Sequence, residues 1–118
     1  MVAQVKRIGI VGSRDYPHPS DIKNYVQNLP NGTVVVSGAA RGVDSIAANE
    51  ARRRGLEIIE FPADWSKGRG AGFARNGKIV EASDEIVAFW DGKSRGTLDT
   101  ITKARKAGKP VTIIEPSK

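Results

Sequence analysis

Short apolar runs rich in β-branched residues recur along the chain, and the segments between them place apolar residues at helical spacing. The runs are VKRIGIV at 5–11, TVVV at 33–36, LEIIEF at 56–61, EIVAFW at 85–90 and VTII at 111–114. Runs of this length that end at turn residues are typical of strands buried on both faces of a sheet. The pattern therefore predicts five strands.

Helices are expected between these strands. The first follows Ser20, a favoured N-cap residue, and apolar positions such as Ile22 and Val26 share one of its faces. The later helices are predicted at 44–54, 73–82 and 98–107. Asp44 and Thr97 stand at the beginning of two of them, where a carboxylate or hydroxyl can cap free amides.

Strands that alternate with helices predict a single α/β domain over residues 1–118, with a Rossmann-like, three-layer α/β/α arrangement. Right-handed crossovers cover both faces of such a sheet with helices and make its strands parallel. We expect the five strands in the order 3-2-1-4-5. Ligands of such folds bind beyond the carboxyl ends of the strands, where the strand order reverses, here between strands 1 and 4.

The loops at that edge of the predicted sheet share an unusual composition. GSRDYP at 12–17, SGAARGVD at 37–44 and WDGKSRGT at 90–97 each combine glycine with a hydroxyl side chain and an arginine. Glycine lets a ligand approach the backbone, a helix N-terminus attracts an anion, and arginine binds phosphate through paired hydrogen bonds. The predicted phosphate-binding residues of these loops are Gly12, Ser13, Arg14, Ser37, Gly38, Arg41, Gly42, Asp91, Gly92, Ser94, Gly96 and Thr97. The alternative is that these loops are only the turns that every α/β domain needs.

Composition restricts the chemistry of the site. The chain has no cysteine, and its one histidine, His18, lies between Pro17 and Pro19. A zinc site and a Ser-His-Asp triad are therefore not expected, and no metal is predicted. The net charge of +6 is compatible with a phosphate-bearing partner, although cations at helix ends account for part of it.

The chain shows no sign of membrane insertion or export. No apolar stretch approaches the ~20 residues that span a bilayer. The N-terminal MVAQVKRIGIVG lacks the apolar length and the cleavage pattern of a signal peptide. We therefore expect a cytoplasmic protein with no membrane partner.

Two familiar nucleotide-binding signatures are missing. No G-x-G-x-x-G follows the first strand, and the second strand ends at Ser37, where dinucleotide-binding folds place a carboxylate for the ribose. GFARNGK at 72–78 has the spacing of a P-loop, but Ile79 replaces the Ser or Thr that holds magnesium, and no strand precedes it. Neither a nicotinamide cofactor nor a P-loop nucleotide site is expected.

Several residues near the loops allow two interpretations. Asp91 either contacts a ribose or acts as a base, or it simply forms the turn before Gly92. Trp65 and Trp90 either stack on a base or pack as core or lid residues. Phe73 is expected in the core, and PADWSKGRGAG at 62–72 is expected to be a mobile loop.

Taken together, the motifs GSR, SGAARGVD, PADW, AGFARN and WDGKSRGT resemble those of the SLOG superfamily. This superfamily takes in the DprA/Smf DNA-processing proteins, the LOG phosphoribohydrolases and the small YspA-like domains, and the chain is most similar to the last of these. The resemblance spans nearly the whole chain. It implies a Rossmann-like fold and a nucleotide or nucleotide-derived ligand.

The similarity to LOG enzymes implies only half of their catalytic pair. Those enzymes cleave the N-glycosidic bond of a nucleoside monophosphate with an arginine and a glutamate. Arg75 matches the arginine, and Gly96 and Thr97 match a conserved G-T, but Thr100 stands at the position of the glutamate. A threonine cannot stabilise a developing oxocarbenium ion as a carboxylate does, so hydrolysis is not favoured. The candidate catalytic residues for that alternative are Arg75, Asp91 and Asp99.

Three functions stay open on the sequence. The favoured one is binding or sensing of a small-molecule nucleotide derivative, with Arg75 and Asn76 closing over the ligand and no further cofactor. The others are LOG-like nucleotide hydrolysis and DprA-like binding of single-stranded DNA, the latter less favoured because aromatic residues for stacking are few. A homodimer is expected by analogy with relatives alone.

Overall fold

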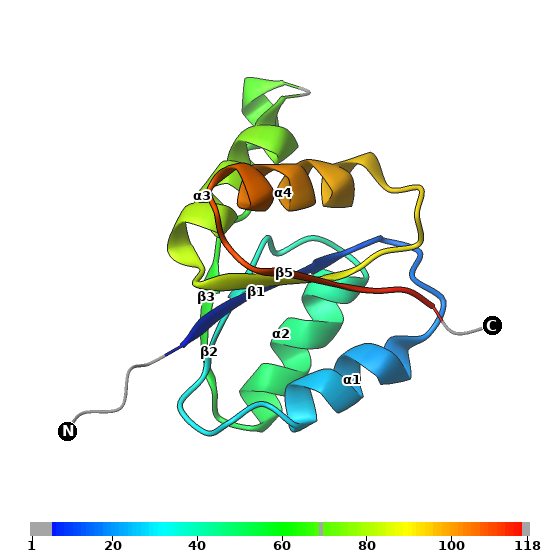
Figure 1. The fold of residues 1–118 in the computed structure, drawn as a ribbon, viewed down its shortest axis with the longest axis vertical. Coiled ribbons are helices and arrows are strands. Elements are labelled where there is room, and N and C mark those ends of the chain that lie inside the picture. The colour runs from blue at the N-terminus through cyan, green and yellow to red at the C-terminus, as the bar shows by residue number, and fades with distance from the viewer. Residues whose placement is uncertain (1–5, 69, 117–118) are drawn as a thin grey trace.

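Five parallel strands form the centre of the structure, in the predicted order β3-β2-β1-β4-β5. The computed structural model describes residues 6–68 and 70–116. The strands are β1 (Arg7–Gly12), β2 (Val34–Ser37), β3 (Glu57–Glu60), β4 (Glu85–Phe89) and β5 (Val111–Ile114). Because β1 pairs in parallel with both β2 and β4, the carboxyl ends of these strands meet at one edge of the sheet (Figure 1). The predicted first strand also included Val5, which lies outside the described residues.

Helices cover both faces of the sheet. They are α1 (Pro19–Gln27), α2 (Val43–Arg53), the short 3₁₀ helix η1 (Trp65–Lys67), α3 (Ala71–Ala82) and α4 (Arg95–Lys106). α1 and α2 pack together on one face, and α3 and α4 pack together on the other (Figure 1). The predicted three-layer arrangement is therefore confirmed. No helix of the described part of the chain is long and apolar enough to cross a membrane.

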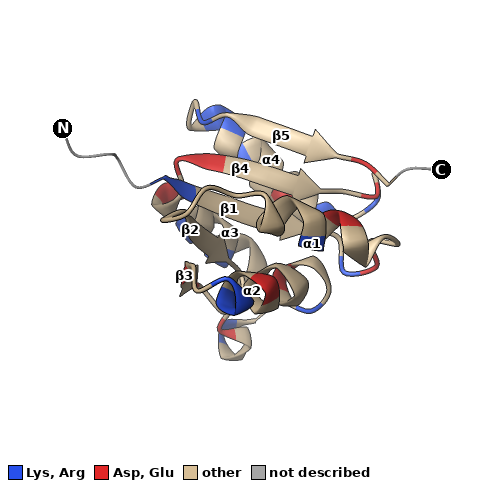
Figure 2. Ribbon diagram, turned by 90° about the horizontal axis from the view of Figure 1, so that it is seen from below, with Lys and Arg blue, Asp and Glu red and all other residues tan. Residues whose placement is uncertain are grey.

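The sheet separates two apolar clusters. Alternate residues of each strand point to opposite faces, so Phe89 packs toward α1 and α2 while Ala88 packs toward α3 and α4. Charged side chains gather on the helices and at strand ends (Figure 2). Lys6 and Glu85, for example, form an ion pair of 2.9 Å at the amino ends of β1 and β4. The interior residues of the strands are buried between the two helix layers, which explains why the strand sequences are continuous apolar runs.

Two helices begin before the residues predicted as their caps. The N-cap position of α1 is His18 instead of Ser20, because Pro19 suits the first helical position, where no amide donor is needed. The N-cap position of α2 is Gly42 instead of Asp44. Gly42 has a φ of 78°, which glycine adopts readily, and Asp44 consequently lies inside the first turn of the helix.

α3 and α4 also begin earlier than predicted. Ser94 instead of Thr97 is the N-cap of α4, and its Oγ accepts a hydrogen bond from the Thr97 amide at 3.3 Å. The predicted loop at 62–72 contains η1 and the first two residues of α3, and its Arg69 lies outside the described residues. Capping hydrogen bonds at Asp64 and Ser94, which the spacing of apolar residues does not reveal, account for η1 and for the earlier start of α4.

Candidate functional site

A cavity of about 590 Å³ opens at the carboxyl ends of β1 and β4, which is the position predicted from the strand order. Its volume is in the range typical of small-molecule sites. The predicted site residues that line it are Gly12, Ser13, Arg14, Arg41, Arg75, Asn76, Asp91, Ser94, Gly96 and Thr97. The predicted residues that do not line it are Ser37, Gly38, Gly42, Gly92 and Asp99. All three loops therefore reach the cavity, but each sends only some of its residues there.

In the loop after β2, a backbone amide is hydrogen-bonded to the carboxylate of Asp44. The Ala40 amide donates to Asp44 Oδ2 at 3.2 Å. Ser37 is fully buried, and its Oγ accepts from the Ala39 amide at 3.3 Å. We expected this loop to offer its amides to a phosphate, but the Ala40 amide already has an acceptor. Asp44 therefore fills the place of an anion in this loop.

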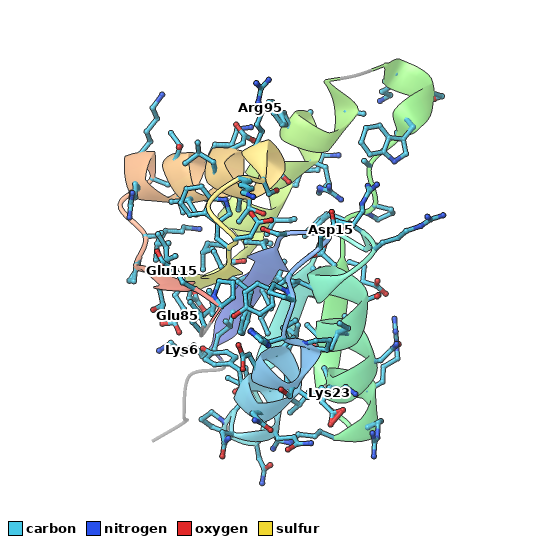
Figure 3. All side chains as sticks on the ribbon, turned by 90° about the vertical axis from the view of Figure 1, so that its right-hand side faces the viewer. Lys6, Asp15, Lys23, Glu85, Arg95 and Glu115 are labelled. Atoms are coloured by element: carbon cyan, nitrogen blue, oxygen red, sulfur yellow. The ribbon has the colours of Figure 1, made fainter. Side chains whose placement is uncertain are left out.

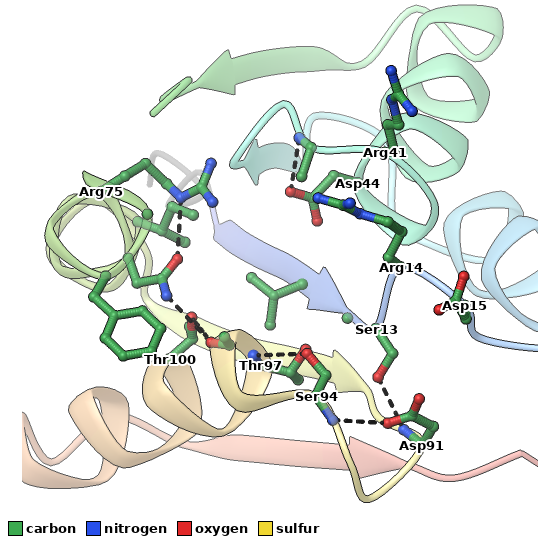
Figure 4. Close-up of a pocket in the computed structure, with 18 of the residues that line it drawn as sticks. Ser13, Arg14, Asp15, Arg41, Asp44, Arg75, Asp91, Ser94, Thr97 and Thr100 are labelled. Carbon is green, nitrogen blue, oxygen red and sulfur yellow. Dashed lines mark hydrogen bonds between the residues drawn. The ribbon is translucent and has the colours of Figure 1, made fainter. Parts of the chain in front are cut away.

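Gly42 joins the loop after β2 to the loop after β1. A Cβ atom at Gly42 would overlap the backbone carbonyl of Arg14, so the two backbones are in direct contact. This contact brings Arg14 and Arg41 to the same side of the cavity, opposite Arg75 (Figure 4). The role of Gly42 is thus to allow close packing of two loops.

Ser13 and Asp91 connect the ends of β1 and β4. The Ser13 amide donates to the Phe89 carbonyl at 3.0 Å, and Ser13 Oγ accepts from the Asp91 amide at 3.1 Å. Asp91 Oδ1 accepts from the amides of Lys93 at 2.8 Å and Ser94 at 3.0 Å. Hydrogen bonds from these amides, that of Lys93 first, lower the pKa of the Asp91 carboxyl. Asp91 thus forms the turn that the sequence allowed, and it holds the loop in front of α4.

The N-terminal turn of α4 contributes a hydroxyl-lined wall. Thr97 is buried, and its Oγ1 lies 3.0 Å from Ser94 Oγ. Thr100 is also buried and donates to the Gly96 carbonyl at 3.2 Å. Because Ser94 and Thr97 stand at the N-terminus of α4, whose dipole attracts negative charge, this wall favours an anion in the cavity.

Arg75 and Asn76 connect α3 to its neighbours. Arg75 donates from Nη1 to the carbonyls of Gly38 and, at 3.3 Å, Phe61. Asn76 donates from Nδ2 to the carbonyl of Gly96 at 3.2 Å and to Asp99 Oδ2 at 3.1 Å. These side chains hold the wall of the cavity together, and Asp99 lies behind Asn76.

Two aromatic side chains stand at the α3 side of the cavity. Trp65 is 64% exposed, and its ring lies over the backbone of Gly72, where a Cβ atom would be 3.1 Å from Cη2. Phe73 lines the cavity and is 48% exposed, so the prediction that it belongs to the core is wrong. Its place in the first turn of α3 turns it away from the sheet. Trp90 instead packs on the apolar cluster below α3 and α4, and its Nε1 donates to the Ser94 carbonyl at 3.1 Å.

The rim of the cavity carries cations without carboxylate partners. Arg14, Arg41 and Lys93 are exposed, and none of the ion pairs found among residues 6–68 and 70–116 involves them. Asp15 lies on the same rim, and Figure 3 shows it well away from Lys6 and Glu85 at the amino ends of the strands. Guanidinium and ammonium groups without carboxylate partners at the rim of a cavity can bind a phosphate.

Asp44 lines the cavity, although the sequence predicted it to be a helix cap. Burial raises the pKa of its carboxyl to about 6, although the Ala40 amide, the nearby Arg75 and the Gly38 amide oppose the shift and Glu60 adds to it. A buried carboxylate with a raised pKa in a cavity is typical of functional sites. The sequence signal for a role of Asp44 in the site was its position directly after G-A-A-R-G-V, within one of the three predicted loops. The prediction of a helix cap accounted for this residue without a ligand.

The chain is similar to known proteins in sequence and in fold. The family model of the YspA, cpYpsA-related SLOG family matches residues 10–68, which include the first two loops and Asp44. The Gene 61 protein of Mycobacterium phage D29 is 36% identical over 118 residues, with 91% of this chain and 94% of that protein covered.

Two solved structures share the fold. DNA processing protein A (DprA) from Streptococcus pneumoniae superposes with a TM-score of 0.83 at 22% identity, over 96% of this chain and 51% of that one. DprA from Helicobacter pylori, described by its single-stranded DNA binding mode, superposes with a TM-score of 0.72 at 25% identity. That match covers 96% of this chain and 66% of the H. pylori chain. The chain thus spans about half the length of the first DprA, and the α/β fold is confirmed.

Proposed function

The chain belongs to the YspA, cpYpsA-related SLOG family, and on that premise we propose that its cavity binds a phosphate-bearing nucleotide or nucleotide-derived ligand. The observation that supports this proposal is the division of the cavity into two ends. Exposed cations that form no ion pair with other described residues stand at the end formed by the loops after β1 and β2, and exposed aromatic rings stand at the α3 end. A nucleotide has the same polarity, with a phosphate at one end and a flat base at the other.

The phosphate is assigned to the cationic end. Arg14 and Arg41 each offer several N–H donors, and Lys93 adds a point charge beside the N-terminus of α4. Ser13, Ser94 and Thr97 line this wall, but their hydroxyls already take part in hydrogen bonds that shape the loops. The arginine side chains therefore carry most of the expected phosphate affinity.

The base is assigned to the aromatic end. Trp65 and Phe73 both line the cavity and leave much of their ring surface exposed. Stacking of a base on an aromatic side chain contributes about 1–3 kcal/mol. Arg75 and Asn76, which we expected to close over the ligand, form the wall beneath this end. A hydrogen bond from a sugar hydroxyl to Asp91 stays a prediction, since Oδ1 of that carboxylate already accepts two amides.

Binding experiments with point variants test the proposal. Isothermal titration with AMP, GMP, CMP and UMP should show binding, and Arg14→Ala and Arg41→Ala should each weaken it by about 1–3 kcal/mol, the scale of a lost charged hydrogen bond. Arg105→Ala, which removes an exposed arginine from the last turn of α4, is the matched control and should leave affinity unchanged. Absence of binding by all four nucleotides, or equal effects of the three variants, would contradict the proposal.

Single-stranded DNA is the second candidate ligand. The H. pylori DprA that shares this fold is described as binding single-stranded DNA, and the net charge of +6 suits a polyanion. An oligonucleotide that contacts several phosphates loses affinity steeply as salt rises, whereas a single nucleotide in a cavity responds weakly. Titrations of dT12 and of the monophosphates at 50 and 200 mM salt distinguish the two. Tight, steeply salt-dependent binding of dT12 alone would favour DNA.

Hydrolysis of an N-glycosidic bond is the alternative that the site supports least. Thr100 occupies the position at which LOG enzymes carry glutamate, and its hydroxyl donates to a carbonyl of its own helix. Arg75 is engaged by backbone carbonyls. Neither arrangement provides the paired groups of those enzymes. Release of free base from a nucleoside monophosphate would nevertheless establish turnover directly.

A further inference from the structure

Asp44 presents one carboxylate oxygen to the backbone and the other to the cavity. The side chain is 6% exposed, and Oδ2 accepts the amide of Ala40 at 3.2 Å. Figure 4 shows the second oxygen turned into the space between Arg14 and Arg75. Every fully buried polar side-chain atom of the described residues has a hydrogen-bond partner. The second oxygen is therefore the part of this side chain that a ligand can reach.

The position of Asp44 is between the two ends of the cavity. On one side, the Asp44 carboxylate and the Arg75 guanidinium both lie against Gly38. A Cβ atom at Gly38 would be 2.9 Å from Asp44 Oδ2 and 2.7 Å from Arg75 Nη1. On the other side, Gly42, two residues before Asp44, touches the backbone of Arg14. A nucleotide that spans from the arginine rim to the aromatic rings would place its sugar beside Asp44.

We propose that Asp44 accepts a hydrogen bond from a ribose hydroxyl and makes the cavity selective for ribonucleotides over their deoxy forms. The inference rests on the proposed function. A carboxylate repels a phosphate but accepts neutral hydroxyl donors, and a sugar offers such donors at the middle of the ligand. A site that is built around a substrate hydroxyl discriminates strongly against the analogue without it, because the buried acceptor is left unpaired.

The charged groups around Asp44 determine how this contact depends on pH. Arg75 on α3 and Glu60 on β3 act on it in opposite directions, and Arg14 and Arg41 line the same cavity. Burial raises the pKa of Asp44 to about 6. The ionised carboxylate is the stronger acceptor, so ribonucleotide affinity should be full above pH 7 and should fall as the pH drops below 6. The second ionisation of a phosphate also occurs near pH 6, so a control without Asp44 is needed.

The test compares three forms of one nucleotide. The monophosphate that binds most tightly among AMP, GMP, CMP and UMP is titrated as its ribo, 2′-deoxy and 3′-deoxy forms at pH 5.0 and 7.5. The wild-type protein should bind the ribo form at least about tenfold more tightly than one of the deoxy forms at pH 7.5, as expected for loss of a charged hydrogen bond. Asp44→Asn should reduce this ratio to about threefold or less and should show only the pH dependence of the phosphate.

A variant of an exposed carboxylate outside the cavity provides the matched control. Glu81→Gln removes an exposed carboxylate at the far end of α3 and should leave both the ratio and the pH profile unchanged. The wild-type comparison stands even if Asp44→Asn fails to fold. Equal affinity of the wild type for all three sugar forms would overturn the role of Asp44 and leave the proposed function intact. Absence of binding to any nucleotide would overturn both.

Discussion

Arg75 donates a hydrogen bond from its guanidinium to the backbone carbonyl of Gly38, which ties α3 on one face of the sheet to the loop that follows β2. The same group also donates to the carbonyl of Phe61 at 3.3 Å. One side chain thus holds the ends of β2 and β3 in place at the edge of the cavity. An arginine matched to a catalytic arginine by its motif has, in this structure, a clear positioning role.

Replacement of Arg75 should therefore destabilise the fold. Arg75→Met leaves two carbonyls without their donor, and we expect a loss of about 1–3 kcal/mol in the free energy of unfolding, measured by urea denaturation. Lys78→Met on the same helix removes an exposed cation and should change stability by less than about 0.5 kcal/mol. Similar stabilities of the two variants would show that the hydrogen bonds of Arg75 contribute little.

Two glycines should respond to alanine in opposite directions. Gly42 has a φ of 78°, and a Cβ atom there would overlap the carbonyl of Arg14, so Gly42→Ala should destabilise the protein by more than about 1 kcal/mol. Gly77 lies inside α3, and a Cβ atom there meets nothing within 4 Å. Gly77→Ala should stabilise the protein by about 0.4–1 kcal/mol. Thermal unfolding of both variants checks the pair, and a loss at both positions would contradict it.

Asp44 should make the free protein less stable as the pH rises. Its pKa is about 6 in the folded protein and 3.8 as the reference value, so the folded state retains the proton between these two pH values. The free energy of unfolding should then fall across this window by about 3 kcal/mol from this residue. Urea denaturation at pH 4.5 and 7.0 should show that the free energy of unfolding of Asp44→Asn lacks this fall between the two pH values. A constant difference between wild type and variant would show that the carboxyl does not titrate in this range.

Trp65 should report on the base. Because its ring is 64% exposed at the cavity, nucleotide binding should change its fluorescence, and Trp65→Ala should weaken binding by about 1–3 kcal/mol. Trp65→Phe keeps an aromatic face and should retain most of the affinity. Trp90 has its Nε1 bonded to a carbonyl and stays in the variant as an internal reference. Unchanged affinity in Trp65→Ala would remove this residue from the site.

The elements were predictable because each depends on a local pattern. The β-branched runs identify the strands, and right-handed crossovers leave few strand orders to choose from. The sequence therefore predicts that the loops at 12–17, 37–44 and 90–97 lie at one edge of the sheet. The structure confirms the strand order and brings residues from all three loops to one cavity.

The directions of individual side chains were less predictable. Phe73 was expected in the core, but it lies in the first turn of α3, which points away from the sheet (Figure 1), and its ring is exposed. Asp44 was expected to cap α2, but the helix begins at Val43, and the carboxylate binds the loop that precedes it. Periodicity gives the face of a helix on which a side chain lies, but not whether a neighbouring element covers that face.

The sequence by itself determined the fold class, the strand order and the edge of the sheet at which a ligand would meet glycine, hydroxyl and arginine side chains. Only the tertiary structure decided which of those groups remain available, because Ser13 accepts a hydrogen bond from Asp91 and Arg75 donates one to Gly38, and no local pattern connects either pair. Periodicity is a property of neighbouring residues, whereas the availability of a donor or an acceptor depends on contacts between distant ones.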